Sequence, residues 1–504
     1  MLTNLKALVV VLAIAWAVFA LARPFCLRWM SAQAFARRRN VWFALTLVAF
    51  ASPAFWIYGL FALVLLVWAT GKDENPLALF VLVTFTVPNV RFYLPGLVFN
   101  QLFDLTQYRI LSLAILVPLV SRIWARPDEW GDRRLRLADV LLLAFLLLQV
   151  VLGMPYESLT NTIRRSFLFG LDTFIVFYAF SRIVDKEKIV EVMACFWLCC
   201  VVMAPIAIFE SVRGWLLYTG LASLWGDPNA FAWISRGDTL RAQAGSGHSL
   251  NLGYLMAMAL GMFLYLRTRA VALTFTWLVM LVLAAGLFVS GSRGAWLTAA
   301  LAATVFVLLR PDAFKRLAGA MAIGVVVIGV MYVTPLKHSV IDKLPIIGTA
   351  DQDTVDYRQQ LAEVSWSLIK QNPFFGDQFV YLQMEALRQG QGIIDIVNGY
   401  LYTALFSGGV GLALQCGVLL LPLWYAFKRF TEERAVDSDF AQAGVALVAC
   451  MVATLFFIGT AGFSVTSYVL AGLLMSYATT YANAEAQERT FPAFATNKRT
   501  SLAA

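Results

Sequence analysis

Apolar runs of membrane-spanning length recur along the whole chain, separated by short polar stretches. Because a helix needs about 20 apolar residues to cross a bilayer, this pattern predicts an all-α polytopic membrane protein with about 12 to 15 transmembrane helices. The run from 41 to 70 is divided only by Pro53, and 77–90 is short for a crossing. The expected spans are 7–22, 40–52, 54–70, 77–90, 106–122, 138–154, 166–181, 189–209, 249–266, 272–289, 294–309, 317–333, 399–424, 441–460 and 465–481.

Two long polar segments interrupt the apolar pattern and define the expected organisation. It comprises amino-terminal transmembrane helices (1–209), an external loop (210–248), central transmembrane helices (249–333), a long external loop (334–398), carboxyl-terminal transmembrane helices (399–481) and a cytoplasmic tail (482–504). The second loop contains an amphipathic pattern at about 356–371, which Asp353 or Thr354 can cap. Such a helix lies across the membrane face or packs as a lid, and the pattern fits both.

Basic residues set the expected orientation. Arginines and lysines concentrate in four connections, at 23–39, 122–136, 310–316 and 428–434. With the spans above, all four fall on the same side, which the positive-inside rule assigns to the cytoplasm. Both long polar segments then face the opposite compartment.

Composition supports a membrane protein and narrows the chemistry. The chain is 60% hydrophobic and 14% charged, which is unlike soluble domains. The net charge of +9 follows from the basic connections, so no nucleic-acid partner is needed to explain it. The two histidines leave little material for a metal site, and no zinc or haem spacing occurs.

Two arginines on the outer face are candidates for binding an anion. Arg293 lies in Ser290-Gly-Ser292-Arg-Gly-Ala-Trp296, between two spans, and Arg241 opens a glycine-punctuated stretch that reaches Gly253. Guanidinium groups on opposite walls of one cavity would suit a diphosphate, with Ser290 and Ser292 as small donors. The alternative is that both arginines reach lipid headgroups from the ends of their spans.

Three residues are candidates for a general base. Asp395 lies just before the span that starts at 399, where partial desolvation would raise its pKa. It could equally cap that helix. Glu385 and His248 are the other candidates, and His248 could instead hold its turn by a hydrogen bond.

Asp172 is an ionisable residue inside an apolar run, which makes it a functional candidate. A buried pair with a nearby arginine is the simpler interpretation, and it is the one we favour.

The outer-face motifs resemble those of a known family, the O-antigen ligase and Wzy-type polymerase group of bacterial polysaccharide assembly. The resemblance covers roughly residues 240–412. It rests on Ser290 to Trp296, Arg241 with Gly247-His248, Arg358 with Pro373-Phe-Phe-Gly376, Asn398-Gly-Tyr400-Leu401 and Gly408 to Leu412. Each motif alone is weak, but their order and spacing around one long loop are fairly specific.

The resemblance implies a GT-C-type, inverting, metal-independent glycosyltransferase without a cofactor in the bacterial inner membrane, active on the periplasmic side. Its implied donor is a glycan on undecaprenyl diphosphate, and Arg241, Arg293 and Arg358 would hold the diphosphate. Asn398 and Tyr400 would support the site. The expected partners are a lipid-linked donor and acceptor, the lipid bilayer, and a flippase and chain-length regulator.

One departure from the family pattern affects the mechanism. Ligases of this family have a histidine before the asparagine that matches Asn398, and this chain has Val397 there. The variant is more similar to exopolysaccharide polymerases, so Asp395 becomes the expected base. We therefore expect a polymerase in exopolysaccharide or O-antigen assembly, with an O-antigen ligase acting on lipid A-core as second candidate. A non-enzymatic transporter is third, since no internal repeat is seen.

Overall fold

The computed structural model describes most of the chain. It covers residues 2–94, 103–127, 132–227, 231, 233–236, 239–270, 272–310, 352–389, 392–433 and 438–490, with the single positions 313, 315 and 319. The expected span at 317–333, the first part of the long external loop and the end of the tail lie outside this described part.

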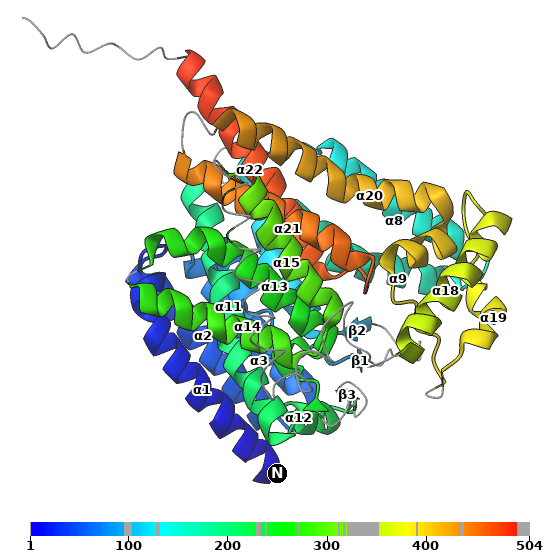
Figure 1. Cartoon of the computed structure of the whole chain (residues 1–504), viewed down its shortest axis with the longest axis horizontal. Coiled ribbons are helices and arrows are strands. Elements are labelled where there is room, and N and C mark those ends of the chain that lie inside the picture. Colours follow the sequence, from blue (N-terminus) through cyan, green and yellow to red (C-terminus); the bar gives the residue numbers. More distant parts are fainter. Residues whose placement is uncertain are drawn as a thin grey trace, which may run out of the picture.

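The described residues are almost entirely helical (Figure 1). The amino-terminal helices are α1 (Leu2–Cys26), α2 (Ala32–Ala51), α3 (Phe55–Lys72), α4 (Pro76–Val83), α5 (Gln107–Leu111), the π-helical η1 (Ser112–Leu116), α6 (Val117–Ala125), α8 (Leu137–Gly153), α9 (Leu159–Asp172) and α10 (Phe174–Phe180). The later helices are α11 (Lys186–Arg213), α12 (Thr219–Leu224), η2 (Ala244–Ser246), α13 (Ser249–Leu266), η3 (Arg267–Arg269), α14 (Leu273–Val289), α15 (Arg293–Leu308), α18 (Gln352–Gln371), α19 (Val380–Gln383), η5 (Glu385–Leu387), α20 (Gly399–Glu433), α21 (Ser438–Ile458) and α22 (Val465–Thr490).

Two short antiparallel hairpins accompany the helices. Strand β1 (Phe92–Leu94) pairs with β2 (Phe103–Leu105), with Phe92 opposite Leu105. Strand β3 (Ser235–Arg236) pairs with β4 (Thr239–Leu240), with Ser235 opposite Leu240. The second hairpin leads directly into Arg241.

Within the described residues, 7 helices are long and apolar enough to cross a membrane. Three shorter apolar helices, α8, α14 and α15, accompany them. These findings confirm the expected all-α polytopic membrane protein, whereas the total of 12 to 15 spans stays a prediction.

Several expected spans are divided, shortened or locally distorted. Pro53 separates α2 from α3, as predicted. The 77–90 run forms only the 8-residue α4, whose side chains are all buried in protein. The 106–122 run includes the π-helical turn η1 immediately before Pro118, which cannot donate a backbone hydrogen bond. The 166–181 run is divided between α9 and α10 at Thr173.

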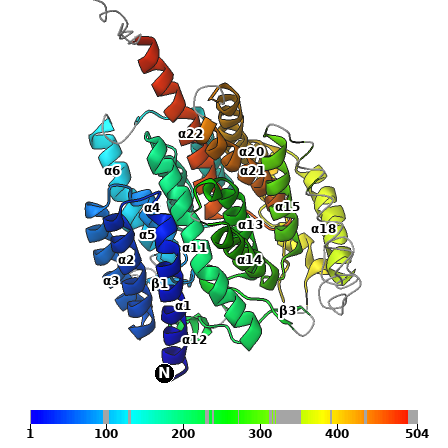
Figure 2. The same ribbon diagram turned by 60° about the vertical axis from the view of Figure 1, so that its left-hand side comes forward.

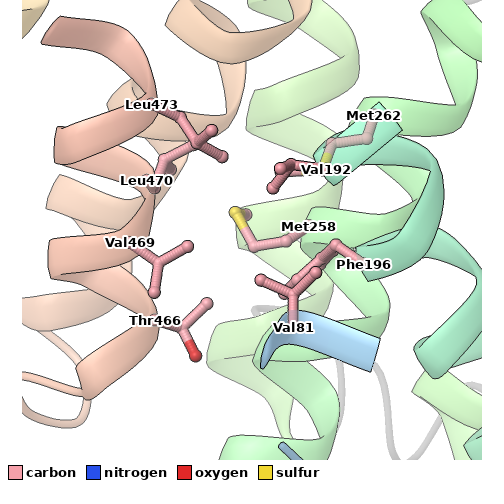
Figure 3. Close-up of a pocket in the computed structure, with 9 residues that line it drawn as sticks. All are labelled: Val81, Val192, Phe196, Met258, Met262, Thr466, Val469, Leu470 and Leu473. Atoms are coloured by element: carbon pink, nitrogen blue, oxygen red, sulfur yellow. The ribbon is translucent and has the colours of Figure 1, made fainter. Parts of the chain in front are cut away.

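Helix α11 forms the centre of the molecule. Its buried residues extend from Ile189 to Glu210 and cover most sides of the helix. In Figure 2 it runs between the amino-terminal helices α1–α3 and the group α13–α15. A small apolar cavity of about 10 Å³ remains beside it, among Val81, Phe196, Met258 and Leu470 (Figure 3). That volume is at the lower limit for one water molecule, so the space is a gap in core packing rather than a ligand site.

The basic connections gather at one end of the bundle. Arg28 donates to the carbonyl of Arg269 (2.6 Å), and Arg269 pairs with Asp439 (2.5 Å). Arg310 likewise donates to Gln442 at the start of α21. Arg28 and Arg310, from two of the four basic connections, are thus both linked to the start of α21.

Candidate active site

The stretch after β4 lies directly against the corner between α14 and α15. Arg241 Nε donates to the carbonyl of Ser290 (3.0 Å), and the Ala242 amide donates to Val289 (3.0 Å). Gly291 has a φ of 61°, and a Cβ there would lie 3.1 Å from Arg241 Cγ. The corner therefore needs glycine both for its backbone conformation and for the close approach of Arg241.

The two serines of the corner stabilise its backbone. Ser290 Oγ donates to the Leu287 carbonyl (2.7 Å), and Ser292 Oγ accepts the Ala295 amide (3.4 Å) as the N-cap of α15. Both side chains are buried. Their hydroxyls thus serve the turn and the cap, and they place Arg293 as the first residue of α15.

Arg241 packs on the same corner that carries Arg293. Backbone pairing between the Arg241 stretch and the end of α14 brings Arg241 to this corner. The placement of the two guanidinium groups on opposite walls of one cavity stays a prediction. Beside Arg241 lies a cavity of about 50 Å³, lined by Ser211, Thr239, Leu240, Arg241, Phe288, Val289, Gly291 and Trp296.

Helix α18 contacts the Arg293 corner through Thr460. Arg358 donates to the Thr460 carbonyl (3.4 Å), and a Cβ at Gly294 would lie 2.7 Å from Thr460 Oγ1. The Thr460 turn therefore touches both α18 and the Arg293 corner. In Figure 1, α18 and α19 lie at one side of the molecule, beside α20 and α9.

A tyrosine of α18 holds Asp395 in place. The Tyr357 hydroxyl accepts the Asp395 amide (3.1 Å) and donates to the Asp395 carbonyl (3.0 Å). Asp395 does not cap the following helix, because the Asn398 side chain does so. Asn398 Oδ1 accepts the amides of Tyr400 (3.0 Å) and Leu401 (3.1 Å). The carboxylate of Asp395 is therefore not used for capping.

His248, Asp395, Arg241 and Arg358 form one electrostatic group. Partial enclosure by protein raises the pKa of Asp395, while His248 and Arg358 oppose this rise. Enclosure and the charge of Arg241 lower the pKa of His248, which Asp395 opposes. Enclosure also lowers the pKa of Arg358, against the effect of Asp395. The side chains of His248, Asp395 and Arg358 all retain contact with solvent, so a substrate can reach them.

The His248 side chain has a defined hydrogen-bonding state. Its Nδ1 accepts the Leu250 amide (3.2 Å) at the start of α13. An imidazole nitrogen that accepts an N–H carries no proton, so this contact assigns the proton of the neutral ring to Nε2. His248 thus holds its turn, as one interpretation of the sequence proposed, and it offers an Nε2–H donor rather than a base.

Two family motifs pack together and fix the position of α18. Gly408 interrupts α20 with φ 63° and ψ −167°, a conformation essentially limited to glycine. The backbone at this kink pairs with the segment after α18: Gly409 donates to Pro373 (2.7 Å) and Asp377 donates to Leu405 (2.8 Å). The Pro373 to Gly376 and Gly408 to Leu412 motifs therefore form one structural joint.

Helix α18 also begins earlier than expected. It starts at Gln352 rather than near Asp356, so Asp353 and Thr354 lie inside its first turn instead of before it.

The remaining candidates have other partners. Glu385 pairs with Arg388 (2.6 Å) in an exposed ion pair, and this contact lowers the pKa of Glu385. The Tyr400 hydroxyl donates to the Leu455 carbonyl (2.7 Å) and so anchors α20 to α21. Asp172 pairs with Arg109 (2.8 Å) on α5. Asp172 therefore has an arginine partner in a partly buried pair, and that partner is distant in sequence, whereas Arg165 pairs with Glu157.

The structure adds three residues that the sequence did not single out. Thr460 joins the corner to α18, Tyr357 holds Asp395, and Glu210 binds the backbone of the Arg241 stretch. Glu210 had a visible signal, since it is a carboxylate at the end of the apolar run of α11. Thr460 and Tyr357 act through long-range contacts that leave no local pattern.

The comparison with known proteins agrees with this site. No curated protein matches the chain. Residues 278–416 match the family model described as O-antigen ligase. This match includes the Arg293 corner, Arg358, Asp395 and the α20 kink, whereas Arg241 and His248 precede it. The match confirms the resemblance inferred from the motifs. Residues 278–416 of this multi-pass membrane protein are therefore similar to the O-antigen ligase family.

Proposed function

We propose that this protein is an inner-membrane polysaccharide polymerase. It transfers a growing glycan from undecaprenyl diphosphate onto a lipid-linked repeat unit, on the periplasmic side, in exopolysaccharide or O-antigen assembly. The observation that carries the proposal is the grouping of Arg241, His248, Arg358 and Asp395, from distant stretches, around the Arg293 corner.

The chemistry assigns a role to each group. A hydroxyl of the acceptor sugar attacks the anomeric carbon of the donor glycan, and the bond from that carbon to the diphosphate oxygen breaks. Asp395 takes the hydroxyl proton, and its raised pKa improves its match to this task. Arg241, Arg293 and Arg358 stabilise the negative charge on the departing lipid diphosphate. His248 Nε2–H adds a neutral donor beside them.

A polymerase is preferred over a ligase because Val397 occupies the position where ligases of the family carry histidine. This leaves Asp395 as the base with the best geometry. A ligase that transfers the glycan to lipid A-core is the second candidate, and the description of the matched family favours it.

The first experiment tests the assigned roles in purified enzyme. Lipid-linked repeat units isolated from a deletion strain serve as substrate in nanodiscs. Asp395→Asn should reduce turnover by about 10²- to 10⁴-fold while donor binding is retained. Arg241→Ala and Arg293→Ala should abolish elongation and weaken donor binding. Arg388→Ala, at an exposed arginine of the same loop, is the matched control. Wild-type turnover in Asp395→Asn, or wild-type binding and turnover in both arginine variants, would refute the mechanism.

A second experiment separates the two candidates. Deletion of the gene should remove long polymer and leave single repeats on the lipid carrier if the protein is a polymerase. Full-length polymer that stays on its carrier would instead identify a ligase.

A further inference from the structure

A buried carboxylate lies behind the candidate active site. Glu210, in the last turn of α11, has a relative exposure of 0%. Its Oε1 accepts the Leu217 amide (3.0 Å), and its Oε2 accepts the amides of Gln243 (3.0 Å) and Ala244 (2.8 Å). Removing a carboxylate from water is costly, and three backbone donors compensate for that cost here.

The two amides on Oε2 belong to the turn that connects Arg241 with His248. In this turn Ala244 has φ 44°, the one positive value for a non-glycine residue in the described part of the chain. On the other side, a Cβ at Gly245 would lie 1.9 Å from the Phe85 carbonyl oxygen. The turn is therefore held between α11 and the end of α4, in a backbone conformation that an L-residue rarely adopts.

We propose that Glu210 is a positioning residue for the donor site, an inference that rests on the proposed function. The carboxylate accepts hydrogen bonds from two successive amides and so fixes the backbone between Arg241 and His248. This sets how the Arg241 guanidinium and the His248 Nε2–H are presented to the diphosphate of the lipid donor. Glu210 touches no substrate and acts through these two side chains.

The capacity of both oxygens to accept hydrogen bonds is essential to this role. Both carboxylate oxygens accept, which a glutamine cannot reproduce, because its amide nitrogen only donates. Glu210→Gln keeps the size and shape of the side chain, but it sets an N–H against the Leu217 amide and replaces the carboxylate oxygen that holds Gln243 and Ala244 with a weaker amide acceptor. The expected result is a folded protein with a loosened turn.

The first measurement follows the turn itself. Hydrogen–deuterium exchange on the full chain in nanodiscs should show faster exchange in peptides covering 241–248 of Glu210→Gln than of wild type. Glu191→Gln is the matched control, since Glu191 lies on the same helix and pairs with Arg38 (2.7 Å) away from this turn. Unchanged exchange of the turn in Glu210→Gln would show that Glu210 does not hold the turn, whatever the activity of the protein.

The second measurement connects the turn to the donor. Undecaprenyl diphosphate should bind Glu210→Gln about tenfold or more weakly, with KM for the lipid-linked repeat raised more than kcat is lowered. In an Arg241→Ala background the same substitution should cause a smaller loss than it does alone, since part of its effect passes through Arg241 and the rest through His248. Fully additive losses, or unchanged affinity despite faster exchange, would reject the positioning role. If Arg241→Ala binds undecaprenyl diphosphate as wild type does, the proposed function fails instead. The exchange experiment then still shows whether Glu210 holds the turn.

Discussion

At the scale of single residues, the structure shows which candidate residues hold the backbone. Ser290, Ser292 and Asn398 stabilise turns and helix starts. Asp395 is held through its main chain by Tyr357, and its carboxylate does not cap the following helix. The spacing of the motifs alone does not reveal this difference.

The proposed base makes a testable prediction about pH. A base works only when unprotonated, and enclosure raises the pKa of Asp395, so activity should fall on the acid side at a higher pH than for an ordinary aspartate. The charge of Arg358 lowers that pKa. Arg358→Gln should therefore move the acid limb of the kcat/KM profile to still higher pH, in addition to reducing activity.

The pH–rate profile of each variant in nanodiscs measures this effect. Arg388→Gln, which removes an exposed arginine that pairs with Glu385, should leave the limb in place. An acid limb that does not move in Arg358→Gln would separate Arg358 from Asp395 and contradict the electrostatic grouping.

At the scale of elements, the joint between α18 and the α20 kink determines where Arg358 lies. Helix α20 changes direction at Gly408, and backbone groups near this kink form hydrogen bonds with the segment that follows α18. Because the same segment leads back to Tyr357 and Arg358, the kink couples a membrane helix to the outer side of the site. A kink with this conformation is attributed to its glycine rather than to general flexibility.

Substitution at the kink should damage both stability and activity. A Cβ at Gly408 would lie 2.2 Å from the carbonyl carbon and oxygen of Phe374, so the backbone must move. Gly408→Ala should destabilise the protein by about 1–3 kcal/mol and reduce elongation. Thermal unfolding in detergent and the elongation assay measure the two effects.

Gly71→Ala is the matched control, since no heavy atom lies within 4 Å of a Cβ there. Alanine has less conformational freedom than glycine in the unfolded chain. The free energy of unfolding of that variant should therefore be unchanged or higher by about 0.5–1 kcal/mol. A Gly408→Ala protein as stable and active as the Gly71→Ala protein would show that the joint is dispensable.

At the scale of the whole molecule, the basic connections and the candidate site lie at opposite ends of the same helices. The basic connections meet around Arg28, Arg269 and Asp439, whereas the candidate site is built from the loops at the other ends of α13, α14 and α20. Buried ion pairs such as Arg182–Asp139 (2.6 Å, both side chains 0% exposed) belong to the basic end. This separation is what an enzyme needs if its substrates are delivered to one side of the membrane only.

Chemical labelling can test the orientation directly. A cysteine at Arg388 should react with a membrane-impermeant maleimide once the outer membrane is permeabilised, because that residue is exposed near the candidate site. A cysteine at Arg269 should react only after the inner membrane is disrupted. Both are placed in a Cys416→Ser background, since Cys416 is the partly exposed native cysteine and the other five are buried. The opposite pattern of labelling would reverse the topology.

Local sequence patterns determined a large part of this protein. The length of the apolar runs predicted the membrane class, Pro53 separated two helices, and the apolar run from 399 marked the start of α20. The motif around Arg293 predicted the corner and the similarity to the O-antigen ligase family. These features follow from interactions within a few residues, so the sequence records them directly.

Only the tertiary structure decided which distant groups meet. It paired Asp172 with Arg109, and it placed Arg241 on the Arg293 corner. It also brought Glu210 beneath the turn that connects Arg241 with His248. Such contacts depend on how helices pack and on which buried polar groups must be satisfied, and neither has a period along the chain.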